Sequence, residues 1–252
     1  MKRIALFLSL ILLSAPGYCA GPKENPDIKQ IVKKIDNLYR SKSNISRIEM
    51  SIVTPHWQRT LSMDAWGRGT THTFIRILSP QKEKGVATLR IGNEMWNYLP
   101  NAGKVIKIPP SMMMSSWMGS DFTNDDLVKE SSLVDDYNYK LAAPDGAKAG
   151  LIYIEFIPKE DKPIVWGRIL LAVREKDYIP VSEEYFDEKG KLMRVLNFSA
   201  VKKFGKRDLP SVMEMIPQNK AGHKTVITYL KADFDVQVKD DVFTLRNLQS
   251  KE

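Results

Sequence analysis

The chain has a single cysteine, Cys19, and three histidines, His56, His72 and His223, which stand far apart in the sequence. One cysteine cannot form a disulfide within the chain, so no covalent cross-link holds the fold together. It also excludes zinc sites built from several cysteines, and the histidines lack the i, i+4 spacing of a helical metal site. The sequence therefore predicts no metal site and no cofactor.

Motifs of the common enzyme classes are also absent. The segment Ser115-Ser116-Trp117-Met118-Gly119 lacks the glycine that precedes the serine in a nucleophile elbow, and no phosphate-binding glycine loop occurs. Asp125-Asp126 and Asp135-Asp136 could bind a cation or act as acid and base. The first pair equally suits a helix N-terminus and the second a polar turn. We therefore expect no enzyme activity and name no catalytic residue, with a dispersed site as the alternative.

Long apolar runs are missing except at the N-terminus. Lys2 and Arg3 precede the apolar segment Ile4–Leu13, which is too short for the about 20 residues that span a bilayer. Small and helix-stopping residues follow at Ala15-Pro16-Gly17. This arrangement predicts a cleavable signal peptide, residues 1–20, and a mature domain, residues 21–252, that works in the periplasm.

Two alternatives to simple cleavage remain at the N-terminus. The first is an uncleaved anchor, which the shortness of the apolar run disfavours. The second is lipidation at Cys19, but Tyr18 and Pro16 stand where a lipidation motif has a small and an aliphatic residue. The cut itself could follow Gly17, Cys19 or Ala20.

The formal net charge is +8, and Lys2 and Arg3 account for +2 of it, which leaves +6 on the mature domain. The basic residues are scattered, and the densest group, around Gly205, is typical of a solvated turn. Export makes nucleic acid a poor partner for this charge. A transient contact with an anionic membrane surface stays open.

Two hydrophobic periodicities divide the mature chain. Residues Ile28, Ile31, Val32, Ile35, Leu38 and Tyr39 recur at helical spacing and predict a helix over Asp27–Tyr39, with its start at Asn25-Pro26. From Ile45 onward the period is two, which predicts strands in an antiparallel sheet. We expect a mainly β (α+β) fold of roughly eleven strands and three helices. The expected strand segments lie near residues 45–52, 60–65, 74–78, 86–91, 95–99, 105–108, 137–141, 151–157, 165–174, 181–186, 192–201, 212–216 and 225–234.

The segment Ser111–Glu130 interrupts the strands and is unusually rich in large apolar residues. We expect two short helices joined near Gly119, the second starting at a capping box of Thr123 and Asp126. Methionine is flexible and is common on surfaces that accept varied apolar partners. The segment is therefore either a helix packed permanently on the sheet or a mobile lid over an apolar cavity.

The same segment carries a family resemblance. The run Ser115–Leu127, SSWMGSDFTNDDL, resembles the signature segment of outer-membrane lipoprotein-sorting proteins, the LolA/LolB-like superfamily. Further motifs agree in order along the mature chain. These are Pro80-x-x-x-x-Gly85, Met95-Trp96-x-Tyr98-x-Pro100, Ile108-Pro109-Pro110, Asp177-Tyr178-x-Pro180, and Phe243-Thr244 with Leu248.

The resemblance implies an unclosed antiparallel β-barrel whose apolar cavity, under a helical lid, holds lipid or the acyl chains of lipoproteins. It also implies an inner-membrane partner of the lipoprotein-releasing or lipid-exporting type. The chain resembles a longer branch of the superfamily than the prototype carrier. The candidate ligand-binding residues of cavity and lid are Ile31, Ile35, Met50, Met63, Trp96, Met112, Met113, Trp117, Met118 and Phe122.

Two functions fit this reading. The first is a periplasmic carrier that transfers lipid or lipoprotein toward the outer membrane. The second is a module that senses lipid or lipoprotein and regulates an inner-membrane exporter. Lipid that co-purifies with the protein would separate both from an enzyme, and dependence on a membrane partner would separate the carrier from the sensor.

Overall fold

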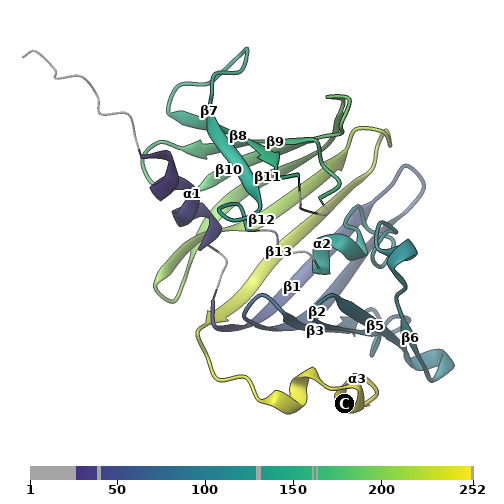
Figure 1. The fold of residues 1–252 in the computed structure, drawn as a ribbon. Coiled ribbons are helices and arrows are strands. Elements are labelled where there is room, and N and C mark those ends of the chain that lie inside the picture. The colour runs from purple at the N-terminus through teal and green to yellow at the C-terminus, as the bar shows by residue number, and fades with distance from the viewer. Residues whose placement is uncertain (1–26, 39–40, 129–131, 161, 163, 251–252) are drawn as a thin grey trace, which may run out of the picture.

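The computed structural model describes residues 27–38, 41–128, 132–160, 162 and 164–250. The signal peptide predicted for residues 1–20 and Cys19 lie outside the described residues, as does the helix start predicted at Asn25-Pro26. Within the described part, one long antiparallel sheet, a first helix and several short helical turns make up the fold (Figure 1).

The first described element is helix α1, Ile28–Asp36, which Asp27 caps. The Asp27 carboxylate accepts hydrogen bonds from two backbone N–H groups of the first turn, at 3.0 and 3.4 Å. These groups have no partner inside the helix, which is why an acceptor at the cap stabilises it. The helix is shorter than predicted at its end and buries one face, formed by Ile31, Val32 and Ile35.

Thirteen strands form one antiparallel sheet in the order β6-β5-β4-β3-β2-β1-β13-β12-β11-β10-β9-β8-β7. β6 and β7 end this order, so the sheet curves without closing (Figure 1). The strands are β1 Ser43–Val53, β2 Gln58–Arg68, β3 His72–Ser79, β4 Ala87–Ile91, β5 Glu94–Leu99, β6 Lys104–Lys107, β7 Tyr137–Ala142, β8 Leu151–Pro158, β9 Arg168–Arg174, β10 Pro180–Phe186, β11 Leu192–Phe204, β12 Arg207–Pro217 and β13 Lys224–Phe234.

The predicted fold class is confirmed, since the chain is mainly β and its sheet is an unclosed antiparallel one. The expected total of roughly eleven strands was too low by two, and it was also lower than the thirteen expected segments, each of which overlaps one strand. β9 begins at Arg168, later than its predicted segment, for a steric reason. Gly167 is among the first residues of that segment, and a Cβ on it would lie only 2.6 Å from the Asp187 carbonyl oxygen. The chain therefore passes close to the backbone of Asp187 at this point, before the strand begins.

One row of side chains crosses the inner face of the sheet. Direct strand pairs join Leu61 to Met50, Met50 to Ile227, Ile227 to Met213, and Met213 to Phe198. Directly opposed residues of an antiparallel pair point to the same face. The inner face of β2 and β1 therefore continues into the inner face of β12 and β11.

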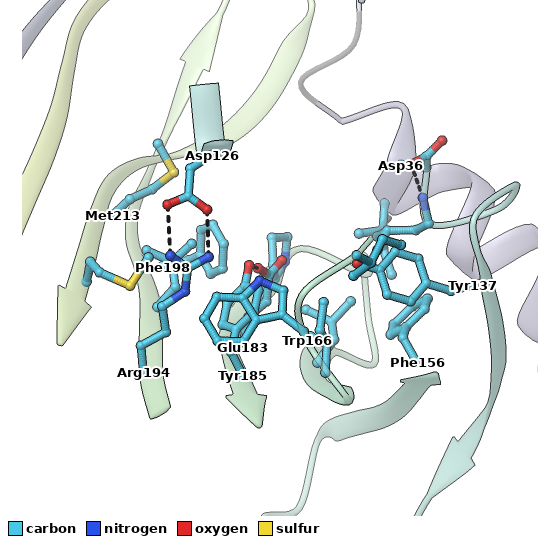
Figure 2. A pocket seen from close by; sticks show the side chains of 18 of the residues that line it. Asp36, Asp126, Tyr137, Phe156, Trp166, Glu183, Tyr185, Arg194, Phe198 and Met213 are labelled. Carbon is cyan, nitrogen blue, oxygen red and sulfur yellow. Dashed lines mark hydrogen bonds and ion pairs between the residues drawn. The ribbon is translucent and has the colours of Figure 1, made fainter. Parts of the chain in front are cut away.

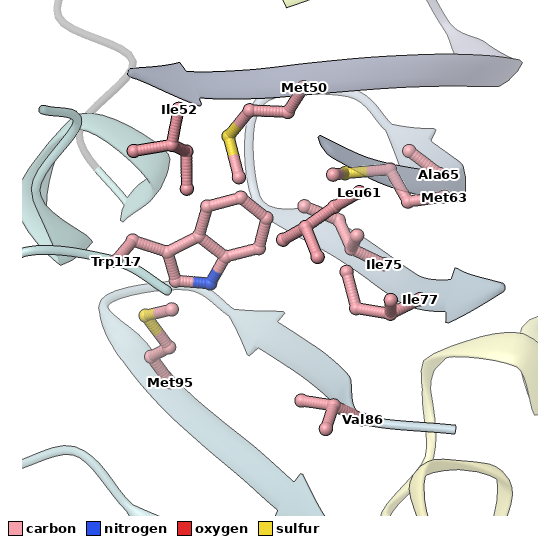
Figure 3. Close-up of a cluster of buried hydrophobic side chains, with 10 residues drawn as sticks. All are labelled: Met50, Ile52, Leu61, Met63, Ala65, Ile75, Ile77, Val86, Met95 and Trp117. Carbon is pink, nitrogen blue, oxygen red and sulfur yellow. The ribbon is translucent and has the colours of Figure 1, made fainter. Parts of the chain in front are cut away.

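The half of this face formed by β1–β5 is filled with side chains. Trp117 lies among the buried side chains of these strands, with its ring between Ile52 and Met95 in Figure 3. Ile48, Ile108, Met113, Met118, Leu127 and Ile227 pack against this cluster. We call the cluster, with the strands that carry it, the filled half.

The insert between β6 and β7 differs from the prediction of two short helices. It has a 3-10 turn, η2 Pro110–Met112, and a short helix, α2 Asn124–Val128, with a looped segment between them. Met118 and Gly119 both have positive φ, 52° and 75°, which a helix does not allow. The predicted capping box is confirmed, because the Thr123 hydroxyl accepts from Asp126 N at 3.1 Å.

The end of the chain covers the opposite, outer face near β3 and β4. A 3-10 turn, η3 Asp240–Phe243, and helix α3 Leu245–Leu248 place Phe243 and Leu248 against the outer side chains of these strands. A four-residue helix is too short to show a periodicity, which explains why the sequence did not reveal it. Another 3-10 turn, η1 Pro100–Ala102, joins β5 to β6.

Candidate functional site

A cavity of about 400 Å³ occupies the inner face of the sheet where β7–β12 carry it, under α1 and the insert. We call this region the hollow half. Most of its lining is apolar or aromatic, and Figure 2 shows these side chains converging from several strands. The lining residues are Ile35, Asp36, Leu38, Phe122, Asp125, Asp126, Leu133, Tyr137, Phe156, Ile164, Val165, Trp166, Ile169, Leu171, Pro180, Glu183, Tyr185, Arg194, Leu196, Phe198, Met213 and Met215.

An ion pair joins the insert to the floor of the cavity. The Arg194 guanidinium on β11 donates two hydrogen bonds to the Asp126 carboxylate on α2, at 2.8 and 2.7 Å (Figure 2). The same guanidinium lies 4.4 Å from the ring centroids of both Trp166 and Tyr185. Paired hydrogen bonds and stacked rings are the arrangement that favours a buried arginine over lysine.

This pairing sets the charge of both groups. Burial by itself disfavours the Asp126 carboxylate, but the hydrogen bonds and charge of Arg194 outweigh it and lower the pKa of Asp126. Burial likewise opposes the charge of Arg194, and Asp126 outweighs it and raises the pKa of Arg194. Both groups therefore stay charged near neutral pH.

A second acid, Glu183 on β10, lies beside this pair. The Tyr185 hydroxyl donates a hydrogen bond to Glu183 Oε2. Burial raises the pKa of Glu183, and the Tyr185 hydrogen bond and the Arg194 charge only partly offset it. Burial, together with the charge of Glu183, raises the pKa of Tyr185 well above its usual 10.0. The cavity thus has a polar floor in an otherwise apolar wall.

The rest of the insert is fixed to the filled half and to β13. Trp117 Nε1 donates to Thr88 Oγ1 at 3.1 Å, and the Thr225 hydroxyl donates to the Asp121 carboxylate at 2.8 Å. Arg59 donates to the backbone carbonyl of Met118. These contacts come from β4, β13 and β2, so the looped part of the insert is held from three strands while α2 reaches the cavity.

Comparison with solved structures identifies the fold. A DUF1329 family protein from Desulfovibrio piger superposes with a TM-score of 0.77 at 24% identity, covering 87% of this chain and 97% of that chain. A putative outer membrane lipoprotein-sorting protein domain from Vibrio parahaemolyticus gives 0.75 at 20% identity, covering 88% and 98%. A LolA superfamily protein from Nitrosomonas europaea gives 0.71 at 19% identity, covering 87% and 98%.

A family model described as "uncharacterized protein" matches residues 69–250, more than half of the chain. The chain belongs to this family, and its fold is LolA-like. The resemblance inferred from SSWMGSDFTNDDL is therefore confirmed. No curated protein matches the sequence. Among the helices that the structure describes, none has the length and apolar character needed to cross a membrane.

The LolA-like fold separates the ten predicted ligand-binding residues. Ile35 and Phe122 line the cavity, and Ile31 is buried next to it in the cluster under α1. Five others belong to the filled half or pack against it, and Met112 is about half exposed. Trp96 packs on the outer face, because its neighbour Met95 points inward and successive strand residues alternate. The five in the filled half are Met50, Met63, Met113, Trp117 and Met118.

Sequence reasoning missed the polar floor of the cavity. Asp126 had been assigned to a helix cap, which is correct, but Arg194 pairs with it from 68 positions away in the chain. In Val181–Phe186 the alternation of residues shows that Glu183 and Tyr185 share a face. It does not show whether that face is the inner one.

The three histidines are not brought together. His56 lies in the turn between β1 and β2, His72 begins β3 and contacts Phe243, and His223 precedes β13. Across the described ranges, no group of three or more histidine, cysteine or acidic side chains is arranged to hold a metal ion. The second acidic pair lies in a polar turn, as expected, where Asp136 accepts from Ser132 N at 2.7 Å.

Proposed function

We propose that this protein is a carrier that binds an acyl chain of a lipid or lipoprotein in the hollow half. The observation that carries the proposal is a cavity of about 400 Å³ with mostly apolar walls, on the inner face of a LolA-like sheet. Binding cavities for small molecules measure about 300–1,000 Å³, so this one suits one chain better than several. Nothing in the proposal needs catalysis, and we propose no enzyme activity.

The insert is the cover of this site. Asp126 holds α2 against Arg194, and Phe122 lines the cavity from the same insert. A chain that enters from this side must first displace α2. Because the looped part of the insert is anchored to the filled half and to β13, we propose that α2 moves, giving up the contact of its Leu127 with the filled half, and that the segment around Trp117 stays in place.

We further propose that the carrier works in the periplasm, after cleavage of the signal peptide at residues 1–20, with residues 21–252 as the carrier domain. Its cargo would pass from an inner-membrane transporter of the lipoprotein-releasing or lipid-exporting type toward the outer membrane. The formal charge of +6 on residues 21–252 supports a transient contact with an anionic membrane surface during this transfer.

The carrier proposal is tested by measuring the lipid that the purified protein binds. We expect organic extraction followed by mass spectrometry to find about one acyl chain per protein, and Nile red to bind the delipidated protein. Leu196→Trp places a large ring in the cavity wall and should weaken Nile red binding about tenfold, or about 1.4 kcal/mol. Leu196 is a buried lining residue, so its substitution acts on the cavity directly.

The matched control is Leu230→Trp. Leu230 is 51% exposed on β13, so the same substitution there should leave dye binding unchanged. If the delipidated protein binds no dye and carries no lipid after mild purification, the carrier proposal is wrong. Equal loss of binding in both variants would place the site elsewhere.

A further inference from the structure

The charge of the cavity is opposite to the charge of the whole chain. The chain carries a formal net charge of +8. Among the residues that the structure describes, the cavity lining holds one basic side chain, Arg194, and four acidic ones, Asp36, Asp125, Asp126 and Glu183. An acyl chain with an anionic end would therefore enter a site that already holds an excess of carboxylates.

Arg194, the one cation in the described part of the lining, already has partners. Both terminal nitrogens of Arg194 donate to Asp126, and Trp166 and Tyr185 each contact the guanidinium at 4.4 Å. Its Nε has no partner among the described residues, but it is buried beyond the reach of a solvent molecule. A ligand carboxylate could reach this arginine only by replacing Asp126.

An acceptor, in contrast, is available. Glu183 lines the cavity, and its Oε2 accepts from the Tyr185 hydroxyl. Over the described ranges no protein group donates to its Oε1. Glu183 is only partly buried, and its Oε1 is not one of the buried polar atoms that lack a partner, so this oxygen is open to a donor from a ligand. In Figure 2, Glu183 lies in the middle of the lining, between Arg194 and Trp166.

We propose that Glu183 selects the polar end of the cargo, accepting a hydrogen bond from an ammonium, amide or hydroxyl group and disfavouring chains that end in a carboxylate. This inference rests on the proposed carrier function and names the chemical class of its ligand. Burial already raises the pKa of Glu183, and an ammonium beside it would lower that pKa again, so the bound pair would be charge-neutral.

The test compares three twelve-carbon probes as competitors of Nile red at pH 7: dodecylamine, dodecanol and laurate. At this pH the amine is charged and laurate is ionised. We expect dodecylamine to bind at least about tenfold more tightly than laurate, equivalent to about 1.4 kcal/mol, with dodecanol between them. This order would show that a cationic donor is favoured over a neutral one. Equal binding of dodecylamine and dodecanol would show that a hydrogen-bond donor is enough without a charge. Both results support the acceptor role.

Glu183→Gln should reduce the preference for dodecylamine over laurate about tenfold while changing dodecanol binding by less than about threefold. Glu184→Gln is the matched control, because Glu184 is the next residue of β10 and points to the other face. Circular dichroism on both variants verifies that they fold. The preference of the wild-type protein for dodecylamine over laurate is measured without any variant, so it tests the proposal even if a variant does not fold.

Laurate that binds as tightly as dodecylamine would overturn this inference, and so would a Glu183→Gln variant with an unchanged preference. In either case dodecanol and Nile red would still bind, and the carrier function would stand. Failure of dodecanol and Nile red to bind the wild-type protein would instead overturn the carrier function itself, and this inference with it.

Discussion

The filled and hollow halves belong to one sheet and share one inner face, yet they have opposite interiors. The row from Leu61 through Met50 and Ile227 to Met213 and Phe198 crosses both. In the first half, Trp117 of the insert occupies the space over the strands. In the second half the space stays open as a cavity. Both halves are formed by antiparallel strands of the same sheet. The segment that covers each half therefore decides which of them can hold a ligand.

The two covers also differ in how they are held. The looped part of the insert is fixed by side-chain contacts to β2, β4 and β13. Over the cavity, α2 is joined to the floor by the ion pair of Asp126 and Arg194. An ion pair can exchange one partner for another, whereas a packed tryptophan can leave only by opening a void. The two halves thus divide stability and binding between them.

The largest expected difference between the halves comes from removing one aromatic ring from each. Trp117→Ala should lower the free energy of unfolding by about 3–5 kcal/mol, because it leaves a void among packed side chains. Phe198→Ala in the cavity wall should cost about 1–2 kcal/mol, because that ring is only partly removed from water. Urea denaturation measures both. Equal losses would mean that the hollow half is packed as tightly as the filled one.

The opposite experiment adds a large side chain to each half instead of removing one. Ile77→Trp should cost about 3 kcal/mol, since a filled core has no room for the ring. Leu196→Trp, facing the cavity, should cost less than about 1 kcal/mol, because the ring enters open space. Thermal unfolding compares the two directly. A large loss for Leu196→Trp would indicate that the cavity walls cannot accept a ligand without rearrangement.

The smallest expected effects are two opposite responses to pH in the hollow half. The pKa of Glu183 is raised above its usual 4.5, so its contribution to stability is complete below that pH and is lost as the pH rises through the raised pKa. Glu183→Gln lacks this loss. Its unfolding free energy should therefore improve relative to wild type as the pH rises from 4 to 7, in urea titrations at each pH.

Asp126 responds in the other direction. Its pKa is lowered below the usual 3.8, so its contribution is present above that pH and is lost as the pH falls through the lowered pKa. Asp126→Asn should be less stable than wild type at pH 7, and the gap should narrow in acid. The same titrations serve as the check. A gap that does not depend on pH would show that the ion pair with Arg194 contributes no charge-dependent stability.

Most of the fold could be read from local patterns. Alternation in the first two strands, and apolar runs bounded by turn residues in the others, marked a segment within every strand. The spacing of Ile31, Val32 and Ile35 predicted α1, and the turn residues of the hairpins fixed their positions. The insert was correctly recognised as apolar and its capping box was correct, but its looped shape depends on contacts with β2, β4 and β13.

By itself, then, the sequence determined which segments contain strands, where the first helix lies and which segment interrupts the strands, since these follow from the order of neighbouring residues. Only the tertiary structure decided which face of each strand is inner, and thus that Met95 points inward and Trp96 outward. It also decided that Trp117 fills one half, and that Arg194 meets Asp126 across 68 positions over a cavity in the other. Contacts between distant segments depend on how the strands curve and stack, which no local pattern encodes.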